Sequence, residues 1–138
     1  MKLLSQVPAV VFALLTSLSA VTDARSAEDA ILQRRMVGVW TGTESRPNVE
    51  VQGTLTLKRN GTFDAMLTVK RPGQVATEVR VSGVWKISLG TLTQTITRSS
   101  DEDLLPVGSS THDKVIGLTS NTLLLGSETG RRQQRFRQ

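Results

Sequence analysis

Hydrophobic and polar residues alternate along most of the chain after Met36, in short segments rich in Val, Leu, Ile and Thr. A period of two is typical of β-strands that bury one face. The pattern predicts eight strands, at Val37–Thr43, Val51–Lys58, Thr62–Val69, Ala76–Ile87, Thr91–Thr97, Lys114–Thr119, Thr122–Ser127 and Gln133–Gln138. Before them, Ser26–Met36 has a helical period. We expect about two turns of amphipathic helix there, with an apolar side made of Ala27, Ala30, Ile31 and Leu32.

Turn residues between these segments indicate that consecutive strands pair antiparallel. Asn60-Gly61 supplies the positive φ angles of a tight hairpin, and Pro72-Gly73 is placed as a β-turn prefers. Ser120-Asn121 provides a third turn. No helical segment lies between the strands to make the crossover that a parallel pair needs. We therefore expect an all-β fold, a small antiparallel up-and-down barrel of about eight strands with a short N-terminal helix, closed so that no edge is exposed.

Alternation also predicts which side chains face the barrel interior. In Thr62–Val69 the apolar residues share one face, and in the longest strand the inward set includes Val79, Val81, Gly83, Trp85 and Ile87. A strand of that length bends to follow a curved sheet, and Gly83 is the expected place for the bend. The segment Asp101–Ser110 breaks the alternation and is expected to be the longest loop.

The N-terminal segment has the features of a secretory signal peptide. Lys2 gives a positive start, Val7–Leu18 is apolar, and small residues up to Ala27 suit cleavage. An uncleaved membrane anchor is the alternative, but this apolar run of about 12 residues is shorter than the ~20 that span a bilayer. We expect a signal peptide at residues 1–27 and a barrel domain at residues 28–138 that has no transmembrane segment. The protein would then be exported, to the periplasm or beyond the cell.

Two Gly-Val-Trp triplets stand in the predicted strands, at Gly38–Trp40 and Gly83–Trp85, with an Asn-Gly-Thr-Phe hairpin at Asn60–Phe63 between them. In this order the chain resembles the lipocalin-like, or calycin-type, domains of small exported bacterial proteins. The resemblance implies that Trp40 plugs one end of the barrel and that a late arginine, Arg135 or Arg137, lies across the indole. Gly38 would leave room for the ring, and a guanidinium stacked on an indole is worth about 0.5 to 2 kcal/mol.

The interior of an eight-stranded barrel is either filled by its own side chains or holds one small ligand. For the second case, the hypothesis is a non-catalytic exported binding module with a small apolar or amphipathic molecule in the barrel mouth. The candidate lining residues are Phe63, Leu67, Val79, Val81 and Trp85. A solid interior is the alternative, and it would direct attention to the outer surface.

The charge pattern supports a second hypothesis, in which a basic outer face contacts an anionic surface. The formal net charge is +5, and the last strand carries a cluster of Arg131, Arg132, Arg135 and Arg137. Lipopolysaccharide or an acidic protein would suit such a face, although a basic excess also simply keeps a protein soluble. We do not expect nucleic acid as a partner, because Phe136 is the only aromatic residue beside these charges and stacking platforms need several.

The sequence offers little for catalysis, metal binding or cofactors, and we expect none of the three. His112 is the single histidine and stands beside Asp113, but no defined nucleophile accompanies this pair. Asp101–Asp103 lacks the alternating ligand spacing and the glycine of a calcium loop. There is no cysteine for a disulfide or a thiolate site, so the core must be stable without crosslinks.

Overall fold

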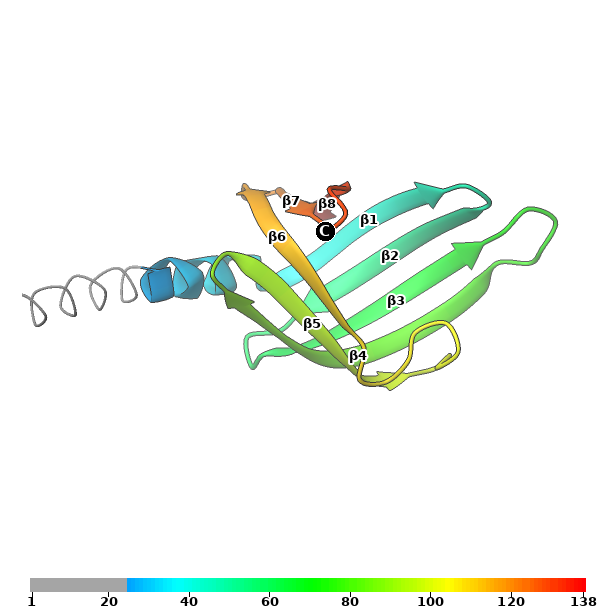
Figure 1. Ribbon diagram of the computed structural model, residues 1–138, viewed down its shortest axis with the longest axis horizontal. Helices are drawn as coiled ribbons and strands as arrows, with labels where there is room; N and C mark the ends of the chain where they lie inside the picture. The colour runs from blue at the N-terminus through cyan, green and yellow to red at the C-terminus, as the bar shows by residue number, and fades with distance from the viewer. Residues whose placement is uncertain (1–24) are drawn as a thin grey trace, which may run out of the picture.

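A computed structural model describes residues 25–138 and confirms the predicted all-β fold (Figure 1). A helix of residues 25–36 precedes eight strands. The strands are β1 (Gly38–Arg46), β2 (Val49–Leu57), β3 (Thr62–Lys70), β4 (Thr77–Ser88), β5 (Thr91–Ser99), β6 (Ser110–Leu118), β7 (Thr122–Gly126) and β8 (Arg132–Arg137). The predicted signal peptide lies outside the described residues, except for residues 25–27, which begin the helix.

Each strand pairs antiparallel with its sequence neighbours, and β8 returns to β1, so the sheet closes into the expected up-and-down barrel. The closing seam is short. Nine residue pairs join β1 to β2, whereas only two join β1 to β8, namely Trp40 with Arg137 and Thr41 with Phe136. Beyond Thr41, β1 has no ladder partner on its β8 side within the described part of the chain.

The helix covers one end of the barrel, the left-hand end in Figure 1. The Asp29 carboxylate accepts hydrogen bonds from the backbone N–H groups of Leu89 (2.8 Å) and Gly90 (2.9 Å), in the turn between β4 and β5. Met36 is fully buried and Leu32 packs against the core. The predicted apolar side is otherwise wrong, because Ala27, Ala30 and Ile31 are exposed where the helix continues beyond the strands.

The core surrounds Trp40 near the helix and extends along β3 and β4 to Val69 and Val79. Its fully or nearly fully buried side chains include Met36, Trp40, Leu57, Val79, Leu92, Leu123 and Leu125. The indole N–H of Trp40 donates to the carbonyl of Met36 (2.9 Å), which links the plug to the end of the helix. Burial of this cluster is the main stabilising term in a domain that has no disulfide.

The plug arginine is Arg137 rather than Arg135. Its Cζ atom lies 4.3 Å from the centroid of the Trp40 ring. Its guanidinium donates to three carbonyls, those of Ser120 (2.7 Å), Val37 (2.9 Å) and Arg35 (2.7 Å). Gly38 has a φ of 143°, and a Cβ atom there would collide with the guanidinium of Arg137. Gly38 therefore makes room for the arginine, whereas no atom of the Trp40 ring lies within 4 Å of that Cβ position.

Two strands differ in detail from the prediction. The β4–β5 register shifts between Ser82 and Gly83, at the predicted bend, where β5 has a bulge at Thr97, and a Cβ atom on Gly83 would collide with the backbone oxygen of Thr95. β6 begins at Ser110, four residues before the predicted Lys114, so the acidic loop is shorter than expected. The sequence pattern missed the start of β6 because Thr111 and Asp113 are polar although they face the interior, which removes the alternation that marks a strand.

Candidate functional site

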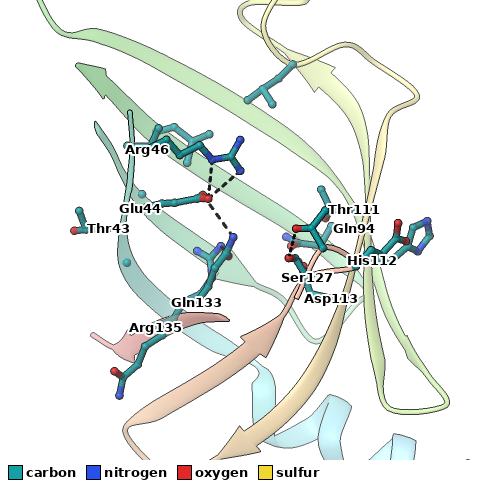
Figure 2. A pocket seen from close by; sticks show the side chains of 18 of the residues that line it. Thr43, Glu44, Arg46, Gln94, Thr111, His112, Asp113, Ser127, Gln133 and Arg135 are labelled. Atoms are coloured by element: carbon teal, nitrogen blue, oxygen red, sulfur yellow. Dashed lines mark hydrogen bonds and ion pairs between the residues drawn. The ribbon is translucent and has the colours of Figure 1, made fainter. Parts of the chain in front are cut away.

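A cavity of about 500 Å³ opens at the end of the barrel opposite the helix. Its wall is built from β1, β2, β3, β5, β6 and β8, from Ser127–Thr129 between β7 and β8, and from Leu105 in the loop between β5 and β6. Figure 2 shows side chains of these elements around this hollow. The barrel thus has one end closed by the helix and the Trp40 plug, and one end open.

A smaller cavity of about 140 Å³ continues from this mouth toward the core. Both cavities are lined by Gly53, Leu67, Gln94, Leu105, Thr111 and Arg135. The smaller one is mainly apolar, and its remaining wall includes Leu55, Phe63, Ala65, Val81 and Ile96. A mouth that carries charged side chains beside apolar surface and leads to an apolar chamber is compatible with an amphipathic guest.

The structure divides the five candidate lining residues between this chamber and the core. Phe63, Leu67 and Val81 line the apolar chamber. Val79 and Trp85 lie instead in the packed core, and the indole N–H of Trp85 donates to the carbonyl of Lys58 (3.0 Å) in the turn after β2. Phe63 and Val81 are also part of the buried core cluster, so the chamber is bounded by the core itself. Sequence alternation places all five on inward faces, but it does not tell which of them are completely covered by neighbouring side chains, as Val79 is beside Leu67.

Arg135 is the main functional candidate that the sequence reasoning assigned to another role. It lies on β8 between the two cavities, and one Nη2 hydrogen bond joins it to the side chain of Gln133 (3.2 Å). Its Nε atom is buried and has no hydrogen-bond partner among residues 25–138. Burial lowers the pKa of Arg135, although the negative charges of Asp113 and Glu44 act in the opposite direction.

Two facing glycines provide space for inward side chains of the site. Gly42 on β1 and Gly53 on β2 are register partners. A Cβ atom on Gly42 would lie 3.4 Å from the Cγ atom of Arg135, and one on Gly53 would lie 2.7 Å from a methyl group of Leu67. Gly42 therefore leaves room for Arg135, and Gly53 leaves room for Leu67.

Glu44 forms ion pairs with two arginines, Arg46 and Arg131, at the mouth of the barrel. Its Oε1 atom accepts from Arg131 (2.8 Å). Figure 2 shows its other two contacts, from the Nη2 of Arg46 to Oε1 (2.8 Å) and a longer one from Gln133 to Oε2 (3.5 Å). Burial acts to raise the pKa of Glu44, but the hydrogen bonds from Arg131 and Arg46 outweigh it, and the pKa lies below its ordinary value. The carboxylate thus bridges β1 and β8 where their ladder has ended.

His112 and Asp113 do not form the pair that their adjacency suggested. Successive strand residues point to opposite faces. His112 is exposed and its Nδ1 lies 3.1 Å from the hydroxyl of Thr93, whereas Asp113 is half-buried. Burial raises the pKa of Asp113, while the charge of Arg135 works against the shift. The arrangement offers a buried acid near a cation rather than an acid-base couple.

The four arginines near the C-terminus do not share one face. Arg135 and Arg137 make their contacts in the cavity wall and on the plug, and Arg131 is paired with Glu44. Arg132 alone is exposed without a hydrogen bond or ion pair among the described residues. The cationic cluster seen in the sequence is therefore split by strand alternation and by ion pairing.

The polar lining was missed although the sequence carried a signal for it. Gln133, Arg135 and Arg137 alternate on one face of the last strand, and that face is the interior. Arg131 stands directly before this strand and Arg132 begins it, and the resulting cluster of charge hides the two-residue alternation. The inward positions of Gln94 and Thr111 could not be found in this way, because they depend on the register between β5 and β6.

Comparisons with known proteins give the chain no family. No protein-family model matches it, and a search of curated proteins finds no match. Its closed antiparallel barrel of eight strands is compatible with a lipocalin-like fold. Within residues 25–138, no helix is long and apolar enough to cross a membrane, and no group of three acidic or histidine side chains could hold a metal ion.

Proposed function

We propose that this protein is a non-catalytic, exported binding module that holds one small amphipathic molecule in the open end of its barrel. The observation that carries the proposal is the shared lining of a mouth of about 500 Å³, which carries charged side chains, and an apolar chamber of about 140 Å³. A guest with a polar head and a short apolar tail would match both parts. The tail would replace empty space against Phe63, Leu67 and Val81, and burial of apolar area would stabilise the complex.

The motif order of the chain supports a lipocalin-like assignment of this module. Gly38 and Trp40 open the barrel, and a late arginine lies over the indole as the resemblance implies. The features of residues 1–27 support export, with the periplasm or the cell exterior as the destination. Such a compartment suits a carrier or sensor of small molecules that are poorly soluble in water.

The first test is native mass spectrometry of the purified protein, followed by titration with 8-anilinonaphthalene-1-sulfonate, an amphipathic fluorophore. We expect a bound small molecule or a saturable rise in fluorescence. Ala65→Leu places three additional carbon atoms in the apolar chamber, and we expect binding to weaken by roughly tenfold, a loss of ~1.4 kcal/mol. Met66→Leu is the matched control, since Met66 is the next residue on β3 and is exposed on the outer face.

Equal binding by wild type and Ala65→Leu would overturn the proposed site, and the lack of any amphiphile binding would overturn the function. Overpacking can itself destabilise a core by about 1 to 3 kcal/mol. Urea unfolding of each variant therefore accompanies the titration. Ala65→Val serves as the milder substitution if Ala65→Leu does not fold.

A further inference from the structure

Three polar side chains line the region that the two cavities share. Gln94 on β5, Thr111 on β6 and Arg135 on β8 line both cavities, so a guest that fills both must pass them. Gln94 and Thr111 are register partners in the β5–β6 ladder, and Arg135, on β8 two strands from β6, lines the same cavities. Neither the Gln94 amide nor the Thr111 hydroxyl makes a side-chain hydrogen bond to another of residues 25–138. The polar head of a guest would meet these groups first.

Among the described residues that line this region, Arg135 has the buried side-chain donor that lacks a hydrogen-bond partner. A guanidinium has five N–H donors and no acceptor. The Nε–H of Arg135 is buried without a partner in the described chain, and a buried unsatisfied donor costs about 1 to 3 kcal/mol, more for a charged group. A guest that supplies an acceptor there recovers this cost. An oxyanion does so best, because hydrogen bonds between charged groups are about twice as strong as neutral ones.

The two acidic side chains that act on Arg135, Glu44 and Asp113, differ in whether they are already paired with other residues. Glu44 is engaged by Arg131 and Arg46 at 2.8 Å each. Asp113 makes no salt bridge or hydrogen bond from its carboxylate within the described residues, and the charged groups that act on it are Arg135, Glu44, His112 and Glu128. Asp113 therefore gives Arg135 partial compensation through space but leaves the Nε–H bond unmade. An incoming anion would gain Arg135 and be repelled by Asp113.

We infer that the guest is a short-chain carboxylate, whose head accepts the Arg135 Nε–H bond while its tail enters the apolar chamber. This inference depends on the proposed function. The chamber of about 140 Å³ limits the tail. A water molecule takes ~30 Å³ of liquid, so the chamber accepts about five atoms of similar size, which matches the chain of hexanoate. Gln94 and Thr111 are placed to bond the second carboxylate oxygen.

The test compares three guests that share one tail, namely hexanoate, hexanol and hexylamine, by NMR titration of the full protein. Wild type should bind hexanoate roughly tenfold or more tightly than hexanol, since one charge-assisted bond is worth ~1.4 kcal/mol or more. Arg135→Gln should remove this preference and leave hexanol affinity within about twofold. Arg132→Gln is the matched control, because Arg132 lies on the same strand but is exposed. It should leave all three affinities unchanged.

Asp113 provides an independent arm of the same test. Asp113→Asn removes the repelling charge, so hexanoate affinity should increase while hexanol affinity stays constant. If Arg135→Gln does not fold, Arg135→Lys replaces it, because lysine keeps the charge but has no donor at the position of Nε. The preference for hexanoate should then fall without disappearing. Chemical shifts of the Arg135 side chain would report contact directly.

The outcomes separate this inference from the proposed function. Binding of hexanol and hexanoate with equal affinity, or a hexanoate affinity that Arg135→Gln does not change, would refute the anionic head and leave the binding module intact. Preference for hexylamine would refute it too and would assign the site to cations through Asp113. If none of the three compounds nor the fluorophore binds, both the inference and the proposed function fail.

Discussion

Replacing Arg137 should test how the barrel end is held together. The guanidinium donates to carbonyls in three separate segments, at Arg35 at the end of the helix, at Val37 before β1 and at Ser120 between β6 and β7, and it stacks on Trp40. Each bond contributes about 1 kcal/mol once the partial exposure of the group is discounted. The stacking contributes about 1 kcal/mol more. We expect Arg137→Ala to lower the free energy of unfolding by about 4 kcal/mol.

That loss is a large fraction of the roughly 5 to 15 kcal/mol that stabilises a domain of this kind. The assay is equilibrium unfolding in urea, monitored by tryptophan fluorescence, since Trp40 is one of two tryptophans in the chain and lies beneath the substituted residue. Arg137→Lys keeps a cation over the ring but cannot span three carbonyls, so we expect it to lose about half as much stability.

Arg132→Ala is the control, with an expected change within about 0.5 kcal/mol because the side chain is exposed on the same strand. The reasoning would be refuted if Arg137→Ala were as mild as this control. It would also be refuted if Arg137→Lys matched wild type, since charge alone would then explain the role of the residue.

Two further substitutions probe the bulge and the buried acid. Gly83→Ala should destabilise the barrel by ~3 kcal/mol or more, because the added Cβ meets the backbone oxygen of Thr95, which no rotamer change can move; Gly117→Ala, whose nearest neighbour would be 3.9 Å away, should cost far less in the same urea assay. Asp113→Asn should stabilise the protein at neutral pH. Burial raises the pKa of Asp113 in the folded state, so the wild type loses stability as pH rises through that pKa, and the advantage of the variant should vanish below the unfolded value of ~3.9. A difference that does not vary with pH in thermal melts would contradict this.

The fold could be predicted from the sequence because its elements depend on local signals. Alternation gave the eight strands, and Asn60-Gly61 and Pro72-Gly73 gave antiparallel neighbours. Gly83 was found as the bend because a glycine within a long strand has few other uses. The start of β6 was lost where the inward positions turn polar at Thr111 and Asp113, since a strand with two polar faces has no period to detect.

The candidate site was harder to predict because it depends on contacts between distant strands. Nothing local to β1 and β2 tells that Gly42 and Gly53 face each other and make room for Arg135 and Leu67 respectively. The same applies to the arginines, whose separation into plug, cavity wall, ion pair and free surface follows from register. Composition could suggest that a cation mattered in the last strand, but only the closed barrel distinguishes Arg137 over the tryptophan from Arg135 beside the chamber.

The short ladder between β1 and β8 leaves the outer half of this seam, within residues 25–138, without backbone pairing. The two ladder pairs and the contacts of Arg137 hold the end of this seam near the helix. Beyond Thr41, among the described residues, Glu44 joins the two sides through Arg131 and Gln133 without any ladder pair, while every other interface keeps at least four pairs. Local opening should need less free energy there than elsewhere in the sheet. Amide protons along the outer half of β1 should therefore exchange with solvent before those of the rest of the sheet. A molecule too wide for the rim would then have a route through the side.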